Sequence, residues 1–84
     1  MNNKFLIRLY VPLIETSYEI WIPPGKTIGN IITLLVKAVM EQSKGYYNPE
    51  ALPNLFNKNT AEIYNPNEKV INTNIRNGTE LILI

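Results

Sequence analysis

The sequence Asn77-Gly78-Thr79-Glu80-Leu81-Ile82-Leu83-Ile84 joins a turn signal to an unbroken apolar run, and this stretch decides the fold. A run that is apolar at successive positions predicts a strand that needs cover on both faces, or a partner on one of them. We therefore expect residues 81–84 to lie inside a sheet rather than at its edge, and no flexible tail to follow them.

Two earlier stretches read as further strands. Apolar side chains alternate with other residues along positions 4–11 and again along positions 17–22. The short connection between them predicts an antiparallel hairpin. Pro23-Pro24-Gly25 then ends strand pairing, because proline donates no hydrogen bond to a neighbouring strand. The side chains expected on the core face are Phe5, Ile7, Leu9, Val11, Tyr18, Ile20 and Ile22.

A long amphipathic helix is expected to follow. Thr27 is a suitable N-cap, because its hydroxyl can accept a hydrogen bond from a free amide of the first turn. Gly45 is expected at the C′ position, where glycine is favoured. The apolar residues that fall within one arc, and that we assign to the core, are Ile28, Ile31, Ile32, Leu35, Val36, Ala38 and Val39.

The remainder of the chain reads as short elements. Residues 46–53 form an irregular connection, in which Tyr46 and Tyr47 are assigned to ordinary loop packing. Residues 55–56 and 61–64 are expected to be two short strands around an asparagine-rich turn. Residues 69–75 are expected to be a loop with one helical turn that places Val70 and Ile75 on the core.

Composition excludes most chemistry. The chain has 84 residues and is expected to be a single domain spanning residues 1–84. It contains no His, Cys or Asp, which removes the usual general base, the thiolate nucleophile and the common ligands of structural metals. Its seven glutamates are spread singly along the sequence. We therefore expect no catalytic site, no cofactor and no metal site, and hence not an enzyme.

The charges give no sign of a polyanionic partner. Eight Lys and Arg residues oppose seven glutamates, for a net charge of +1, and the basic residues are scattered. We expect no nucleic-acid binding. The apolar stretch of residues 28–40 is too short and too polar to insert into a membrane, and no export signal precedes it. The sequence therefore predicts a cytoplasmic protein.

Two stretches carry a resemblance to a known fold. Ile22-Pro23-Pro24-Gly25-Lys26-Thr27-Ile28-Gly29-Asn30-Ile31 looks like the junction between strand and helix in ubiquitin, and residues 74–83 are similar to its closing turn and strand. The resemblance implies an α+β ubiquitin-like β-grasp, with a mixed sheet of four to five strands packed on one long helix. Among small bacterial ubiquitin-like proteins, the chain most resembles the YukD-like family, which is associated with type VII secretion.

The resemblance also frames the function. Ubiquitin-like modifiers and sulfur carriers act through a flexible diglycine tail. This sequence ends instead in Leu83-Ile84. YukD-like proteins similarly lack the diglycine tail. We expect a non-covalent protein–protein interaction module, an accessory component of a type VII-like secretion system whose protein partner is a membrane component of that system. The alternative is a modifier or sulfur carrier whose diglycine tail is absent here.

Alternation also predicts the surface that would bind this partner. The side chains that point away from the helix are expected to form one exposed apolar patch with Tyr10, Trp21 and Ile82 at its centre. Two other readings are a homodimer seam and cover by the connection of residues 46–53. The expected partner-binding residues are Leu6, Arg8, Tyr10, Trp21, Ile82 and Ile84.

Overall fold

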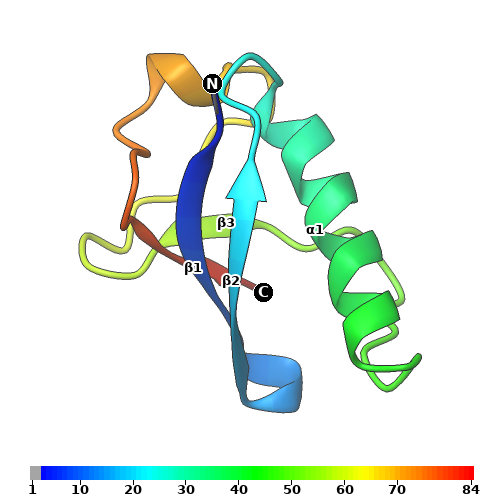
Figure 1. Ribbon diagram of the computed structural model, residues 1–84. Coiled ribbons are helices and arrows are strands. Elements are labelled where there is room, and N and C mark those ends of the chain that lie inside the picture. Colours follow the sequence, from blue (N-terminus) through cyan, green and yellow to red (C-terminus); the bar gives the residue numbers. More distant parts are fainter. Residues whose placement is uncertain (1–2) are drawn as a thin grey trace.

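The computed structural model describes residues 3–84 as one helix packed on a mixed sheet of four strands (Figure 1). The elements are β1 (Phe5–Val11), β2 (Thr16–Ile22), α1 (Ile28–Gln42), β3 (Leu55–Asn57) and β4 (Glu80–Leu83). Two short 3-10 turns, Pro12–Ile14 and Val70–Asn72, lie in the connections. This architecture confirms the α+β arrangement expected from the sequence.

β4 lies inside the sheet, as its apolar sequence predicts. The strand order is β2-β1-β4-β3, in which β4 pairs in parallel with β1 and antiparallel with β3. Leu81 and Leu83 point to the core and are at most 1% exposed, whereas Ile82 points to the opposite face. A parallel pair needs a long crossover connection, and the chain between β1 and β4, including α1, provides it.

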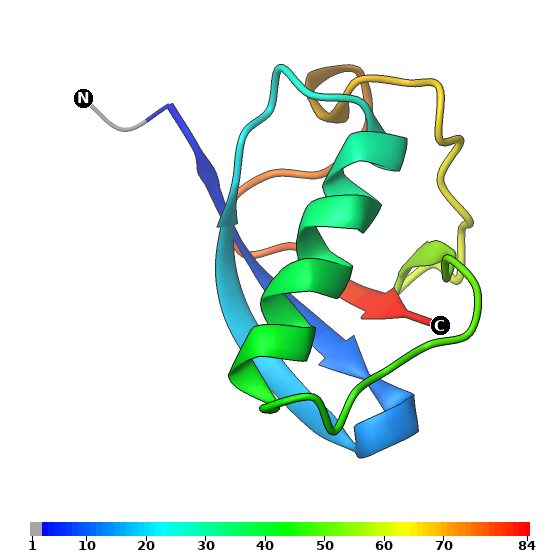
Figure 2. The same ribbon diagram turned by 90° about the vertical axis from the view of Figure 1, so that its right-hand side faces the viewer.

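α1 covers one face of the sheet, which Figure 2 shows from the helix side. The Asn30 amide donates to the Thr27 hydroxyl at 3.2 Å, so Thr27 is the N-cap that the sequence predicts. Lys37 on the opposite side of the helix is exposed. The helix residues buried against the sheet are Ile28, Ile31, Ile32, Leu35 and Val39.

The C-terminal end of α1 differs from the prediction by one residue. Lys44, not Gly45, occupies the C′ position with φ 55°, and Gly45 follows at φ 83°. The Lys44 amide donates to the Glu41 carbonyl and the Gly45 amide to the Met40 carbonyl, at 3.1 and 2.9 Å. These two bonds form a Schellman motif. The motif satisfies carbonyls of the last turn, which offsets the cost of a left-handed lysine.

The expected strand over residues 61–64 is wrong. Only an isolated bridge between Phe56 and Ile63 forms there. The reason is the turn before it: Ala61 has φ 62°, and the Asn57 side chain accepts the amides of Asn59 and Thr60. Ala61 therefore belongs to the turn, like the left-handed residue that ends a bulged hairpin loop, and only residues 62–64 remain to pair with β3.

The connection between α1 and β3 contributes to the core more than expected. Tyr47 is only 2% exposed and belongs to the core, whereas Tyr46 is 81% exposed. Ile84 and Asn54 exchange two backbone hydrogen bonds, of 2.7 and 3.0 Å, which tie the connection to the end of β4. The assignment of Tyr47 to ordinary loop packing is therefore corrected.

The loop before β4 is attached to the start of the helix. The Ile28 amide donates to the Glu68 carbonyl at 2.8 Å, and the Gly29 amide donates to the Pro66 carbonyl at 2.9 Å. A Cβ atom on Gly29 would lie 3.2 Å from the Pro66 carbonyl oxygen, so glycine allows this close approach. Val70 and Ile75 are fully buried, as the sequence predicts.

The two sides of α1 should respond differently to substitution. Leu35→Ala should lower the free energy of unfolding by about 2–5 kcal/mol, because it removes buried methyl groups and leaves a cavity. Lys37→Ala, two residues away on the exposed side, should change it by less than about 0.5 kcal/mol. Urea titration of both variants measures this difference, and equal losses would contradict the assigned helix face.

A polar cluster around the buried side chain of Tyr64 gives the protein a specific response to alkaline pH. The Tyr64 hydroxyl donates to Asn74 Oδ1 at 2.6 Å and accepts from Asn57 Nδ2 at 2.9 Å. Burial raises the pKa of Tyr64, the hydrogen bond from Asn57 lowers it in part, and Glu62 raises it. Because the folded pKa lies above the unfolded value, the resulting stabilisation is complete below the unfolded pKa and is lost as pH rises through the folded pKa.

Tyr64→Phe tests this cluster. At neutral pH the variant should lose about 1–3 kcal/mol, because Asn57 and Asn74 each lose a hydrogen-bond partner. The difference from the unsubstituted protein should shrink above a pH of about 10, where Tyr64 ionises on unfolding. Tyr46→Phe is the matched control, since Tyr46 is exposed. Denaturant titrations at several pH values give the free energy of unfolding of Tyr64→Phe and of the unsubstituted protein. A difference between the two that does not change with pH would contradict the prediction.

Candidate interaction surface

The face of the sheet opposite α1, which we call the outer face, is open to solvent. Trp21 is 50% exposed and Ile63 is 54% exposed there. The connection of residues 46–53 leaves Trp21 and Ile63 at least half exposed, and it approaches the outer face at Ile84, with which Pro49 and Pro53 line a hollow. The reading in which this connection covers the patch does not hold at Trp21.

Leu6 and Trp21 form the first apolar area of the outer face, which we call the Trp21 patch. They are directly opposite each other on β1 and β2. The patch opens into a hollow of about 350 Å³. Asn77 and Gly78, in the turn before β4, line the same hollow. This area therefore consists of an exposed indole beside a concavity of the size of a few side chains.

A second apolar area, the Tyr10 patch, spans three strands and the segment after β3. Tyr10 is opposite Ile82, Ile82 is opposite Phe56, and Phe56 bridges to Ile63. Ile84 is 61% exposed at its border. Together with Phe56 and Ile82, Ile84 lines a hollow of about 270 Å³. This patch contains more apolar side chains than the Trp21 patch.

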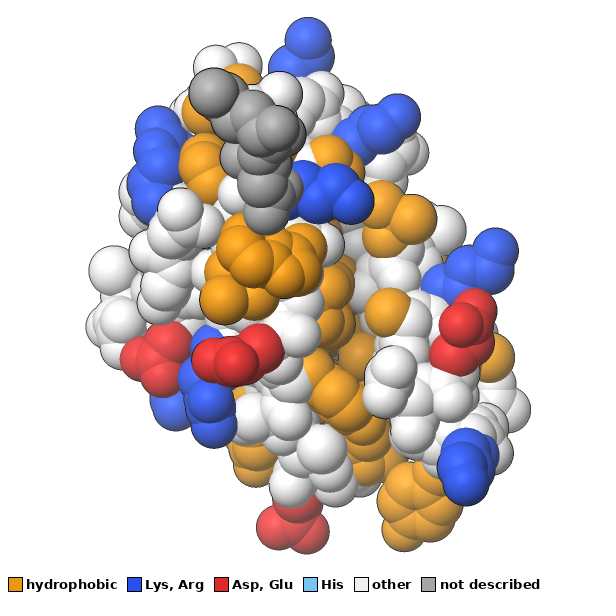
Figure 3. Space-filling model, in the orientation of Figure 1, with side chains coloured by type: hydrophobic (Ala, Val, Ile, Leu, Met, Phe, Trp, Pro, Cys, Tyr) orange, Lys and Arg blue, Asp and Glu red, His pale blue; other side chains and the backbone are white. Residues whose placement is uncertain are grey.

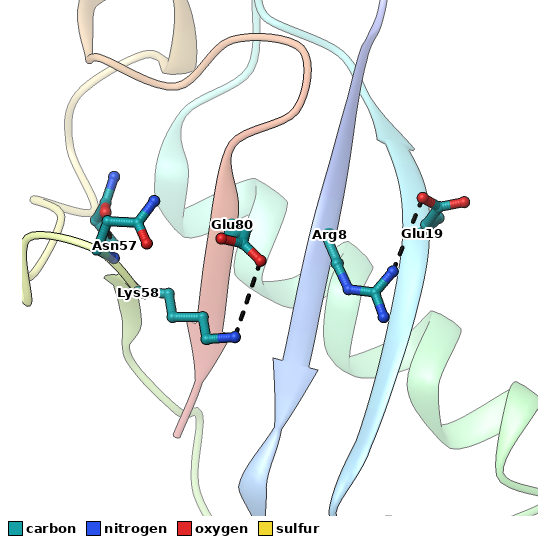
Figure 4. Close-up of polar contacts among 6 residues, drawn as sticks. Arg8, Glu19, Asn57, Lys58 and Glu80 are labelled. Atoms are coloured by element: carbon teal, nitrogen blue, oxygen red, sulfur yellow. Dashed lines mark hydrogen bonds and ion pairs between the residues drawn. The ribbon is translucent and has the colours of Figure 1, made fainter.

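Four charged side chains separate the two patches. Their order across the sheet follows the strand order and alternates in sign, because Arg8 is opposite Glu19 on one side and Glu80 on the other. Arg8 lies 4.0 Å from Glu19 and Lys58 lies 3.8 Å from Glu80 (Figure 4). Figure 3 shows hydrophobic side chains directly above a cluster of charged ones on the strand side of the molecule. We call Glu19, Arg8, Glu80 and Lys58 the charged row.

The charged row corrects the expectation of one continuous patch. The predicted residues Leu6 and Trp21 lie on one side of the row, and Tyr10, Ile82 and Ile84 lie on the other, while Arg8 belongs to the row itself. Alternation places residues on a face but does not say which face positions are neighbours across strands. That information comes from the pairing register.

Four residues of this surface were missed in the sequence: Phe56, Lys58, Ile63 and Glu80. Phe56 and Ile63 extend the Tyr10 patch, and Lys58 and Glu80 complete the charged row. Their positions depend on how β3 pairs with β4 and on the turn after β3. The apolar pair Leu55-Phe56 was the available signal, since one of two successive strand residues must face outward.

The part of the chain that the structure describes places no metal-ligating cluster on the outer face. Within residues 3–84, no group of three or more carboxylate-type or other metal-ligating side chains comes together. Every buried side-chain polar atom in that range has a hydrogen-bond partner. In the same range no helix is long and apolar enough to cross a membrane. The chemistry that this face offers is apolar contact with a charged element in its middle.

Trp21, the single tryptophan, reports on the state of this face. Because the indole is half exposed, its fluorescence should be red-shifted and readily quenched by iodide in the isolated protein. Trp21→Ala should change the thermal midpoint little, since the side chain contributes little to the core. A blue-shifted spectrum that iodide does not quench, in a protein shown to be monomeric by sedimentation, would contradict an open outer face.

Comparisons with known proteins identify the fold. No protein-family model and no curated protein sequence matches the chain. Solved structures match it at low sequence identity. The ubiquitin of Caldiarchaeum subterraneum has a TM-score of 0.68 and 17% identity, with 95% of this chain and 90% of that chain covered. A ubiquitin-like domain from an Arabidopsis thaliana protein has a TM-score of 0.70 and 10% identity, with 99% and 78% covered.

A third match belongs to a larger assembly, the ESX-5 inner membrane complex in its MycP5-free form. Its TM-score is 0.77 at 8% identity, and 99% of this chain corresponds to 21% of that longer chain. Identities this low establish the fold and nothing finer. The mixed sheet in the order β2-β1-β4-β3, the single covering helix and these neighbours together show that the chain has the ubiquitin-like β-grasp fold.

Proposed function

We propose that the protein is a non-catalytic module that binds another protein through its outer face. The observation that carries the proposal is the presence of two solvent-exposed apolar patches, one on either side of the charged row. Exposed aromatic and aliphatic side chains with a few charges between them are typical of protein-binding surfaces. Trp21 and Tyr10 are the expected anchors, since tryptophan and tyrosine are enriched among the residues that dominate binding energy.

The charged row is expected to select the partner rather than to provide most of the affinity. The side chains of Arg8 and Glu19 are 55% and 65% exposed, so their ion pair is weak and water can reach it. A partner that covers the row must supply polar groups that complement its alternating signs. A partner with apolar groups there would leave charges desolvated and unpaired.

We further propose that the partner is a membrane component of a type VII-like secretion system and that the protein acts in the cytoplasm. Two observations support this proposal. The sequence resembles the YukD-like family, and a domain of the same fold occurs within a chain of the ESX-5 inner membrane complex. The second observation is an analogy of fold, and so the proposal needs a direct binding test.

Neighbouring genes give the first test. The proposal expects a secretion ATPase and small helical secreted proteins beside the gene. A gene for an activating enzyme of the kind that adenylates ubiquitin-like proteins would instead favour the modifier or sulfur-carrier alternative, which predicts covalent adducts of the protein in mass spectra of cell lysates.

Direct binding to the cytoplasmic part of the encoded membrane component gives the second test. Trp21→Ala and Tyr10→Ala should each weaken binding by about 1–4 kcal/mol in calorimetric titration, because each removes the aromatic anchor of one patch. Leu34→Ala is the matched control, since Leu34 is 47% exposed on α1, on the other side of the sheet. Sedimentation of each variant reports self-association.

The outcomes separate the alternatives. Binding that is weakened by Leu34→Ala and not by the outer-face variants would contradict the proposed surface. Loss of self-association in Trp21→Ala and Tyr10→Ala, with no measurable binding to the membrane component, would show that the outer face is a homodimer seam. Unfolding of the variants is checked by thermal denaturation, so that a binding loss is not confused with a stability loss.

A further inference from the structure

Asn77-Gly78 is a sequence feature that the proposed function does not use. The sequence contains twelve asparagines, and only Asn77 is followed by glycine. Asparagine is thermolabile because the amide nitrogen of the next residue can attack its side-chain carbonyl carbon. Glycine in the next position favours this attack, because it has no side chain to hinder ring closure and moves freely in φ and ψ.

In the folded protein both reacting groups are tied to one residue of β1. The Leu6 amide donates to Asn77 Oδ1 at 2.8 Å, and the Gly78 amide donates to the Leu6 carbonyl at 2.8 Å. We call this pair of bonds the Leu6 clasp. The turn is also closed by the Thr79 amide, which donates to the Arg76 carbonyl at 3.1 Å. The Gly78 nitrogen can attack only after its hydrogen leaves the Leu6 carbonyl and the Asn77 side chain turns away from β1.

We propose that Asn77 is a site of spontaneous deamidation that the Leu6 clasp suppresses while the protein is folded. In the reaction the Gly78 nitrogen loses its hydrogen and forms a bond to Asn77 Cγ. The bond from Cγ to the side-chain nitrogen breaks, that NH2 group takes up a proton and leaves as ammonia, and a five-membered succinimide results. Water then opens either carbonyl of the ring, giving aspartate or isoaspartate. The balance requires only water, and no oxidant or reductant takes part.

The reaction would change the Trp21 patch. Asn77 lines the same hollow as Trp21, where one arginine and two glutamates, Arg8, Glu19 and Glu80, already give a formal charge of −1. A carboxylate at position 77 changes the formal charge around the hollow to −2. Aspartate keeps an oxygen that can accept from the Leu6 amide, whereas isoaspartate lengthens the backbone of the turn and cannot keep both bonds of the clasp. The proposed deamidation at Asn77 does not depend on any binding partner. Only its effect on binding rests on the proposed function.

The test follows Asn77 by peptide mass spectrometry with an assay that detects isoaspartate. The full chain is incubated in mildly alkaline buffer, folded and in denaturant. Asn77 should react at least about tenfold faster in denaturant, since the reactive state in native buffer is only the small open population. Hydrogen exchange of the Gly78 amide, measured by NMR, gives the fraction of molecules in the open state. This fraction multiplied by the deamidation rate in denaturant should equal the deamidation rate of the folded protein.

Two internal controls check the chemistry. In denaturant the other asparagines should react more slowly than Asn77, and Gly78→Ala should slow the reaction at Asn77. Equal rates at Asn77 in folded and unfolded protein would overturn the proposed protection by the clasp. A rate at Asn77 in denaturant no higher than at the other asparagines would overturn the assignment of the site.

Asn77→Asp tests the effect on the Trp21 patch without waiting for the reaction. At low ionic strength the added carboxylate should reduce quenching of Trp21 by iodide, an anion, and leave quenching by neutral acrylamide unchanged. Asn48→Asp adds the same charge at an exposed position in the connection after α1 and is the matched control. Equal iodide quenching in the two variants would overturn the placement of the charge beside Trp21.

Discussion

The parallel pairing of β1 with β4 is the constraint on which the rest of the structure depends. It aligns Arg8 with Glu80 and Tyr10 with Ile82, and it places both central strands under α1. A parallel pair requires the intervening chain to cross over one face of the sheet. α1 therefore covers one face of the sheet. No helix within residues 3–84 covers the other face, so its side chains can contact a partner. The same pairing creates the core and the candidate interaction surface.

The outer face combines two properties that are usually in tension. Exposed apolar area favours association but also promotes nonspecific contact. The charged row between the two patches restricts which surfaces can cover both of them, because burial of an unpaired charge is costly. Each ion pair in the row is weak, at 3.8 and 4.0 Å, so the row adds little to folding stability. Its physical effect is discrimination among partners, while the apolar patches supply attraction.

Hydrogen bonds attach three loops to the helix and the strands. The Leu6 clasp joins the start of β1 to the turn before β4 beside the Trp21 patch. The hydrogen bonds from Ile28 and Gly29 attach the preceding loop to the helix start, and Asn54 attaches the connection after α1 to the end of β4. In each case a backbone group that regular pairing leaves free finds a partner across the fold. Asn77, the proposed deamidation site, takes part in one of these attachments, the Leu6 clasp.

The sequence by itself determined the central position of the last strand, the N-cap at Thr27 and the buried arc of α1, because these follow from periodicity and from chemistry within a few residues. It also placed Leu6, Tyr10, Trp21 and Ile82 on the outer face. Only the tertiary structure decided that Arg8 and Glu80 divide this face, that Tyr47 enters the core, and that Lys44 takes the C′ position. These outcomes depend on the register between strands far apart in the chain and on competing local hydrogen bonds. The pattern of residue types along the sequence contains neither the strand register nor the outcome of this competition between hydrogen bonds.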